Sequence, residues 1–468
     1  MPMAIAVVAA GLPADELDEF SRAEPALSPT PDGQTLAGDG QAASRFFGLG
    51  EGLLRRLPPR PKRSAQEQAA AESIQAALRA TRTRFLRLYA AQIYAQLTDE
   101  YREPVRVDDL VYRAAAAFPG LVPTREQVLD ERALAQKDKD GREIDQGLFL
   151  AEVLSHPRAG AHLVWAMLRP RVEALERLDE FQRTDRLDLG GAMIERQGRV
   201  GVLWHRNPRF LNAEDDATTR ALELGVDLLL LDPRVEVGVL RGTTVDHPKY
   251  AGRHIFNAGI NLTHLYYGQI SFVDFFIARE MGFVNKIYRG LSYPEFLPDQ
   301  VELTQAEKPW IAAVEAFAIG GGCQLLLVMD YVLAERSSFF SLPARKEGII
   351  PGASNMRLWR FVGDRLARQA ILFDRQFAAD TPEGRLICDQ VVADGQMDAA
   401  LARTVDALLS SGVVSAAGNR KAIRLGQEPI DLFRQYMAVY AREQAACHYS
   451  PQLIRNLEVN WRAHERTI

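Results

Sequence analysis

The fold of this chain is decided by the stretch Lys308-Pro309-Trp310-Ile311-Ala312-Ala313-Val314-Glu315-Ala316-Phe317-Ala318-Ile319-Gly320-Gly321-Gly322-Cys323-Gln324-Leu325. Its apolar run at residues 311–314 leads into three glycines and then a further apolar segment, which predicts a strand, a tight turn and the start of a helix. Glycine permits positive φ and lets a ligand come close to the backbone. The N–H groups of such a turn, at a helix N-terminus, attract an anion. A glycine triplet alone is more typical of a structural turn, so its meaning depends on the rest of the chain.

Strands and helices alternate upstream of this stretch. Residues 193–204 predict two strands around a turn at Gln197-Gly198, residues 215–232 a helix, and residues 235–240 a buried strand. Alternation of this kind is typical of an α/β fold. No internal repeat is present that would indicate a solenoid or a propeller.

Composition divides the chain into four regions. Residues 1–65 are rich in Ala, Pro, Gly and Ser and predict a loose arm. Residues 66–190 predict a helical domain, because apolar side chains recur at three- and four-residue steps from Ile74 to Ile93. Residues 191–395 hold the α/β core, and residues 396–468 again predict amphipathic helices. We expect the helical regions to serve packing and oligomerisation. The residues that would break a helix in the first region are Pro25, Pro29, Pro31, Gly33, Gly38 and Gly40.

Composition also excludes several classes of protein. The 468 residues carry a net charge of −5, which leaves no basic footprint for nucleic acid. No apolar run approaches the roughly 20 residues that a membrane span requires. The first eight residues are apolar but lack the basic segment of a signal peptide, so we expect a cytoplasmic protein. Three widely spaced cysteines suggest neither a disulfide framework nor a zinc cluster.

Four further stretches accompany the glycine triplet. A second glycine turn occurs in His254-Ile255-Phe256-Asn257-Ala258-Gly259-Ile260-Asn261-Leu262, and Asn207-Pro208-Arg209-Phe210-Leu211-Asn212-Ala213 precedes it. Downstream come Phe339-Phe340-Ser341-Leu342-Pro343 and Gly348-Ile349-Ile350-Pro351-Gly352-Ala353. In this order and spacing, from about residue 192 to the end of the chain, the motifs resemble those of the enoyl-CoA hydratase/isomerase (crotonase) superfamily.

This resemblance implies a crotonase-type spiral of ββα turns, assembled into homotrimers that often pair into hexamers. It also implies a CoA thioester whose carbonyl oxygen lies between two backbone N–H groups, which by motif position belong to Ile260 and Gly321. Such a pair stabilises an enolate, since one donor of this kind contributes about 2.7–4 kcal/mol in other enzymes. The resemblance places the remaining CoA contacts at Arg209, Phe210, His247, His254, Ala258 and Gly259.

The chain departs from the hydratases at both of their catalytic glutamates. Gln324 stands where the first would follow the Gly-Gly-Gly-Cys run, and Ala344 stands where the second would follow Pro343. A carboxamide exchanges no proton at neutral pH and a methyl group cannot act at all, so we expect no addition of water. Glu347 lies near in sequence, but the motif gives it no catalytic place, and we expect it at the surface.

The helical N-terminal domain and Gln324 together resemble a narrower group, the cofactor-independent dioxygenases of arylacetyl-CoA thioesters in glycopeptide-antibiotic biosynthesis. This resemblance implies oxidation of a dihydroxyphenylacetyl thioester by O2 to the arylglyoxylate and free CoA. It places Arg279 and Gln324 on one phenolic hydroxyl and Glu214 on the other, with Glu214 also a candidate base. From the residues alone, Arg279 could instead be a surface residue of a helix at 270–286, and Glu214 an acid at a helix N-terminus.

Nothing in the sequence points to a metal or an organic cofactor. The eight histidines are scattered, and none opens the His-x-Asp or His-x-Glu pair that is typical of a non-haem iron site. Neither a Gly-x-Gly-x-x-Gly turn nor the Gly-Lys of a P-loop occurs. We therefore expect chemistry without a metal or cofactor. Two other interpretations stay open at this point, namely hydrolysis or isomerisation of an aryl-CoA, and a non-catalytic crotonase fold that serves as an assembly partner.

Overall fold

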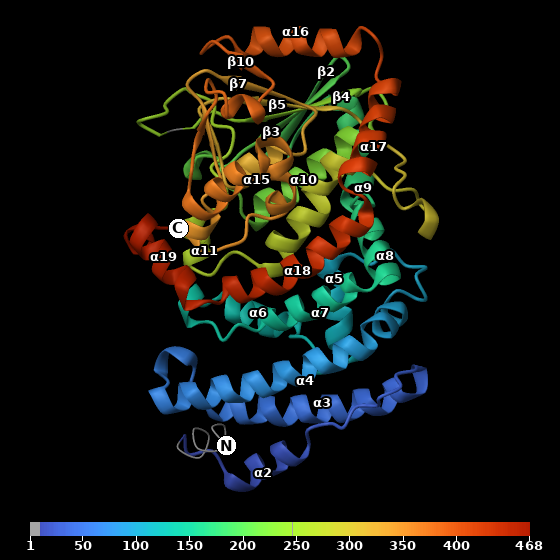
Figure 1. Cartoon of the computed structure of the whole chain (residues 1–468), viewed down its shortest axis with the longest axis vertical. Coiled ribbons are helices and arrows are strands. Elements are labelled where there is room, and N and C mark those ends of the chain that lie inside the picture. The colour runs from blue at the N-terminus through green and yellow to red at the C-terminus, as the bar shows by residue number, and fades with distance from the viewer. Residues whose placement is uncertain (1–9, 246) are drawn as a thin grey trace.

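The structure, a computed structural model, describes residues 10–245 and 247–468. The first helices lie at one end of the long axis of the molecule and the main sheet lies toward the other (Figure 1), and the C-terminal helices return from the sheet end toward the middle. The predicted apolar start of the chain, residues 1–8, lies outside the described residues. Within the described residues no helix is both long enough and apolar enough to cross a membrane.

The prediction of a loose arm is wrong for most of residues 14–56. Helices α2 (Ala14–Arg22) and α3 (Gly33–Arg56) form there, and α3 starts at a capping box in which Asp32 and Thr35 exchange hydrogen bonds. The prolines lie between the two helices and do not interrupt either of them. The glycines of α3 permit close packing, because a Cβ on Gly50 would lie 2.6 Å from Cδ2 of Leu78 on the next helix. Tertiary contact thus outweighs the low helix propensity of glycine.

The predicted helical domain is present as a stack of helices. Its longest member, α4 (Ala65–Leu97), buries Ile74, Leu78, Phe85, Tyr89 and Ile93 along one stripe, as the periodicity predicted. The next helices are α5 (Val107–Ala117), α6 (Arg125–Arg132), α7 (Glu143–Ser155), α8 (Pro157–Met167) and α9 (Val172–Thr184). The division of the chain into four regions stays a prediction, because α4, α5, α7 and α8 share one hydrophobic cluster with residues 430–457, whereas α9 packs in the cluster of the main sheet.

The main sheet has seven strands in the order β1-β2-β3-β4-β5-β7-β10. Strands β1 to β3 are antiparallel and the rest parallel, as expected of an α/β core. The helix α10 (Asp216–Leu231) packs on β2 and β3. The strands are β1 (Arg186–Asp188), β2 (Ala192–Gln197), β3 (Val200–His205), β4 (Val237–Gly242), β5 (Trp310–Val314), β7 (Tyr331–Glu335) and β10 (Gln390–Val392). A second, three-stranded sheet holds β6 (Phe317–Ile319), β8 (Phe339–Ser341) and β9 (Phe377–Ala378).

The segment predicted as one helix at 270–286 has a different geometry. After α11 (Leu262–Tyr266), two wide π-helical runs cover Phe272–Ile277 and Arg279–Val284, and α12 (Asn285–Arg289) follows. The first run is held at its start by Glu143, whose Oε1 accepts a hydrogen bond from the N–H of Phe272 at 2.9 Å. π-Helical turns are rare and frequently occur at functional sites.

The glycine triplet is followed by helices that close the other side of the molecule. The helix α13 (Gly321–Leu326) begins within the triplet, slightly earlier than the predicted start just after it. The long α18 (Ile430–His448) lies along α7 (Figure 1) and packs the C-terminal part of the chain against the helical domain. The remaining helices are α14 (Ala344–Glu347), α15 (Ser354–Phe373), α16 (Met397–Leu409), α17 (Val414–Gln427), α18 (Ile430–His448) and α19 (Pro451–Trp461).

Candidate active site

The two glycine turns meet in the structure. Gly259 has φ 83°, and a Cβ there would lie 3.3 Å from the backbone nitrogen of Gly321. Gly320 has φ 52°, and its Cβ would lie 3.5 Å from Cα of Gly259. Only glycine allows both the backbone conformation and this close approach.

The N–H groups of Ile260 and Gly321 belong to these touching turns. Neither N–H donates a hydrogen bond to any residue in the described ranges, although Ile260 is only 8% exposed and Gly321 is buried. Buried N–H groups are almost always paired, so two free donors side by side are an unusual feature. They lie in the wall of a cavity that both turns line. This arrangement can bind an oxyanion.

Asn257 connects the two turns to the charged part of the site. Its Oδ1 accepts from the N–H of Gly259 at 2.6 Å, and its Nδ2 donates to Glu214 at 2.6 Å. Its carbonyl accepts from Ile319 at 3.0 Å, just before the glycine triplet. Sequence reasoning did not single out Asn257, because a buried asparagine inside a motif gives no signal of its own.

A buried ionic cluster surrounds Arg279, which is 3% exposed. Its guanidinium donates from Nε and Nη2 to Glu214, which is fully buried, and from Nη2 to the carbonyl of Gly321 at 3.0 Å. Nη1 donates to Oε1 of Gln324 at 2.9 Å and also to Glu280. The structure therefore brings Glu214, Arg279 and Gln324 into direct contact beside Gly321, and Arg279 is not a surface residue.

The charges in this cluster are strongly stabilised. Burial favours the neutral form of Glu214, but the adjacent Arg279 outweighs it and lowers the pKa of this carboxyl. Burial likewise opposes the charge of Arg279, and Glu214 and Glu280 together raise its pKa above the ordinary value. Glu214 is thus an ionised carboxylate paired with Arg279, which makes it a weak base.

Glu280 is a second carboxylate that the sequence analysis missed. It is 2% exposed, and its Oε2 accepts from the N–H of Ala353 at 3.0 Å, so it links Arg279 to the Gly348–Ala353 motif. The available signal was the pair Arg279-Glu280 itself, because these two residues are the only charged ones between Phe275 and Val284. Adjacent opposite charges in such a run indicate a buried pair.

Glu347 was expected at the surface, and this expectation is wrong. It is half-buried and lines the same cavity as Ile260, Gly321 and Gln324. Burial, together with the charge of Asp374, raises the pKa of Glu347 to about 7, although the nearby Lys346 opposes the shift. Its carboxylate makes no ion pair or hydrogen bond with the part of the chain that the structure describes. The other side chains of the cavity include Phe275, Phe276, Ile349, Ile350 and Tyr440.

The predicted CoA contacts lie outside this cavity. Arg209 and His247 are exposed, and Arg209 donates to the carbonyl of Ile468 at 2.6 Å. The Nδ1 of His254 is hydrogen-bonded to the carbonyl of Gly242 at 2.9 Å. Phe210 packs edge-on to His264, with 5.0 Å between the ring centroids, while Ala258 and Gly259 belong to the second glycine turn. The roles of these residues stay predictions.

Gly321→Ala tests the tight packing around the free N–H groups. A Cβ there would lie 2.9 Å from Oε1 of Glu214 and 3.0 Å from Nη2 of Arg279, so the buried pair must shift. A displaced side chain costs about 1 kcal/mol, which corresponds to a roughly fivefold lower kcat/KM. We expect this loss in steady-state assays with the thioester substrate proposed below. Gly426→Ala is the control, because a Cβ there meets open space, and equal loss in both variants would contradict the prediction.

Comparison with known proteins places this site in a family. Residues 279–437 match the enoyl-CoA hydratase/isomerase family. The (3,5-dihydroxyphenyl)acetyl-CoA 1,2-dioxygenase of Amycolatopsis orientalis is 47% identical over 428 residues, which span 92% of this chain and 95% of that protein. The chain belongs to the enoyl-CoA hydratase/isomerase family. Within that family its similarity to this dioxygenase includes the N-terminal helices.

Other members of the enoyl-CoA hydratase/isomerase family resemble only part of the chain. A probable enoyl-CoA hydratase of Rhizobium meliloti is 30% identical over 206 residues, or 44% of this chain and 70% of that protein. A solved enoyl-CoA hydratase of Mycobacterium avium subsp. paratuberculosis is 19% identical, with a TM-score of 0.47 over 58% of this chain and 98% of that one.

Proposed function

We propose that this protein is a cofactor-independent dioxygenase. It converts (3,5-dihydroxyphenyl)acetyl-CoA and O2 into 3,5-dihydroxyphenylglyoxylate and CoA. The observation that carries the proposal is the 47% identity over 92% of the chain to a dioxygenase named for this substrate. The contact of Glu214, Arg279 and Gln324 beside two free N–H groups supports it.

The two N–H groups of Ile260 and Gly321 form the proposed oxyanion hole. An aryl group and a thioester both acidify the α C–H, and two aligned donors favour the enolate over the ketone. The electron-rich enolate passes one electron to O2, and recombination at Cα gives a peroxide. The peroxide attacks the thioester carbonyl and expels the CoA thiolate. Loss of the second α-proton with cleavage of the O–O bond gives the arylglyoxylate.

The ionic cluster is the proposed site for the two phenolic hydroxyls. Arg279 and Gln324 hold one hydroxyl and Glu214 accepts from the other, since an ionised carboxylate is a strong acceptor. The apolar wall of Phe275, Phe276 and Ile349 supports this assignment, because it keeps the ring in a dry environment.

Glu347 is the proposed acceptor of the α-proton, in preference to Glu214. A general base works best when its pKa lies near the operating pH. The pKa of Glu347 is raised to about 7, and its carboxylate is unpaired among the residues the structure describes. It also stands one helical turn after Ala344, the position of the second hydratase glutamate, and both residues line the cavity.

An oxygen electrode tests the proposed function directly. The purified protein receives (3,5-dihydroxyphenyl)acetyl-CoA in the presence of a chelator, while O2 and free thiol are followed together. We expect uptake of one O2 for each CoA released. Thiol release without O2 uptake would indicate a thioesterase instead, and neither event would indicate a non-catalytic assembly partner.

Assembly and cellular role complete the proposal. We propose a homotrimer or a dimer of trimers, as in the related enzymes, in a cytoplasmic route to a glycopeptide antibiotic. Large apolar side chains on the outer helices support assembly, because a monomer would leave them in water. They include Trp359, Phe373, Val414 and Val459, which are between 51% and 88% exposed.

A further inference from the structure

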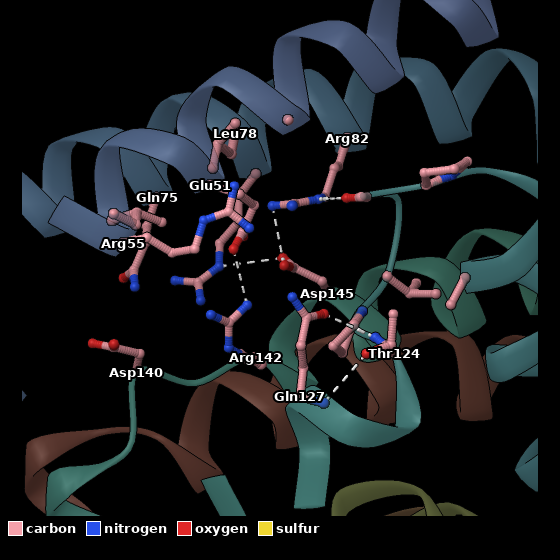
Figure 2. Close-up of a pocket in the computed structure, with 18 of the residues that line it drawn as sticks. Glu51, Arg55, Gln75, Leu78, Arg82, Thr124, Gln127, Asp140, Arg142 and Asp145 are labelled. Carbon is pink, nitrogen blue, oxygen red and sulfur yellow. Dashed lines mark hydrogen bonds and ion pairs between the residues drawn. The ribbon is translucent and has the colours of Figure 1, made fainter. Parts of the chain in front are cut away.

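A second cavity lies in the helical domain, away from the active site (Figure 2). Helices α3 and α4 form one wall, and the segments before α6 and α7 form the other. Its volume is about 270 Å³, which is enough for a small molecule. It shares no lining residue with the cavity around Arg279. Five arginines line it, namely Arg55, Arg63, Arg79, Arg82 and Arg142.

The carboxylates of this cavity do not balance its arginines. Asp140 pairs with Arg63 through two bonds of 2.6 and 2.8 Å. Asp145 is shared by Arg79 at 3.4 Å and Arg82 at 3.0 Å. The third acid, Glu51, pairs with Arg142 at 3.0 Å.

Two positive charges therefore remain without a counter-charge in the cavity. Three carboxylates face five guanidinium groups. Arg55 forms no ion pair with any residue that the structure describes. Arg79 and Arg82, whose side chains are 26% and 4% exposed, share the single carboxylate of Asp145. A network built only for stability would give each buried charge its own partner and leave no void, because a buried charge without a full partner is costly.

The arginines are held in place by the surrounding backbone. Nε of Arg63 donates to the carbonyl of Pro58 at 2.8 Å, and Nε of Arg82 donates to the carbonyl of Gly120 at 2.9 Å. Both side chains are only 4% exposed. Burial lowers the pKa of Arg82, although Asp145 opposes this effect. Nη2 of Arg79 likewise donates to the carbonyl of Gly141 at 2.9 Å. These three guanidinium groups are thus fixed before any ligand arrives, which reduces the entropy cost of binding one.

The remaining wall is partly apolar, and its uncharged polar side chains are Ser44, Gln75, Thr124 and Gln127. Leu54 and Leu78 project from α3 and α4, and Val122 with its flanking prolines closes the opposite side. A ligand that fits both surfaces carries a compact double negative charge and an apolar body. Arginine forks match phosphate oxygens, and a phosphate monoester places two negative charges on a single group.

We infer that this cavity is a binding site for a small phosphate monoester with an apolar body. The site lies on helices that are absent from the hydratase core, and it does not depend on the proposed dioxygenase reaction. Its ligand is held by Arg55 and Arg79 from the two long helices and by Arg142 from the start of α7.

Calorimetry with phenyl phosphate tests this inference on the full-length protein. Two comparison ligands are measured at the same ionic strength. Inorganic phosphate lacks the ring, and benzoate lacks the second negative charge. We expect phenyl phosphate to bind with the lowest Kd. Arg55→Gln and Arg79→Gln should each weaken it about tenfold, since a hydrogen bond to a charged group contributes about 1.5–3 kcal/mol. Arg55→Gln is the safer variant, because this side chain is exposed and holds no ion pair with described residues.

Matched controls remove the same charge elsewhere on the same helices. Arg45 on α3 and Arg84 on α4 pair with Glu19 and Glu24 outside the cavity, so Arg45→Gln and Arg84→Gln should bind like the wild type. Absence of wild-type binding, or equal weakening in the controls, would overturn the site. A change of oligomeric mass in Arg55→Gln would also overturn it, because the cavity would then be a contact between copies of the chain.

Discussion

Glu347→Gln is expected to lower kcat for the arylacetyl thioester by about 10²–10⁴-fold, the usual contribution of a general base. Glutamine keeps the size of the side chain but accepts no proton. The wild-type rate should rise with pH through about 7, because Glu347 acts only in its deprotonated form and burial raises its pKa to about 7. Measurement of kcat across pH 5 to 9 checks both expectations.

The stability of this variant separates a lost base from a lost fold. A carboxyl whose pKa is raised by folding prefers the protonated form, so it destabilises the folded state as pH rises between its ordinary pKa and about 7. Glutamine has no such penalty. We therefore expect Glu347→Gln to be at least as stable as the wild type at pH 8 in denaturant titrations, while its activity is lost.

Asp374→Asn is the matched control for this assignment. The charge of Asp374 contributes to the raised pKa of Glu347, and Asp374 also pairs with Lys346 at 3.0 Å. Its removal should move the rising limb of the pH profile to lower pH while the maximal rate is kept. If the rising part of the pH profile does not move, or if Glu347→Gln keeps full activity, another group accepts the α-proton.

The sequence was sufficient to predict the parts of the site that local chain geometry sets. The turns at Gly259 and Gly320 need positive φ, and glycine is the residue that supplies it, so their motifs are visible in the sequence. The strands of the sheet and the start of α13 follow from apolar runs next to these turns. Arg279 could be placed only through the resemblance to a family, since neither spacing nor periodicity distinguishes it from a surface arginine.

Features set by distant contacts could not be predicted. Glycines in α3 suggested a break, but the helix forms because Gly50 packs on Leu78 of α4. The π-helical hydrogen bonds at residues 272–284 have a spacing along the chain that the positions of the apolar residues do not reveal. Glu347 is covered by α19, where Leu453 approaches Gly348 and Asn460 donates to the carbonyl of Lys346 at 3.0 Å. No residue near Glu347 in the sequence indicates that α19 covers it.

Arg279→Lys is expected to lower kcat/KM by about a hundredfold while the protein stays folded. Lysine keeps the positive charge, but its single ammonium cannot reproduce the planar fork on Glu214 together with the bonds to Gln324 and Gly321. Loss of one or two charged hydrogen bonds of about 1.5–3 kcal/mol each accounts for this magnitude. Steady-state kinetics with the dihydroxyphenyl thioester and with a phenylacetyl thioester check it. The loss should be larger for the dihydroxyphenyl substrate, because only its hydroxyls contact the cluster.

Arg279→Met should differ from the lysine variant in stability as well as in rate. Methionine removes the charge that pairs with Glu214 and Glu280, and breaking a buried pair in this way costs about 3–5 kcal/mol. The pKa of Glu214 is lowered by Arg279, so its contribution to stability is present above its ordinary pKa and is lost as pH falls through the lowered value. The loss of folding stability in Arg279→Met should therefore be largest at pH 7 and should shrink in acid. The stability of Arg279→Lys should instead follow that of the wild type across this pH range. Equal kinetics of Arg279→Lys and the wild type on both thioesters would remove Arg279 from the ring-binding site, because the buried pair would then serve the fold alone.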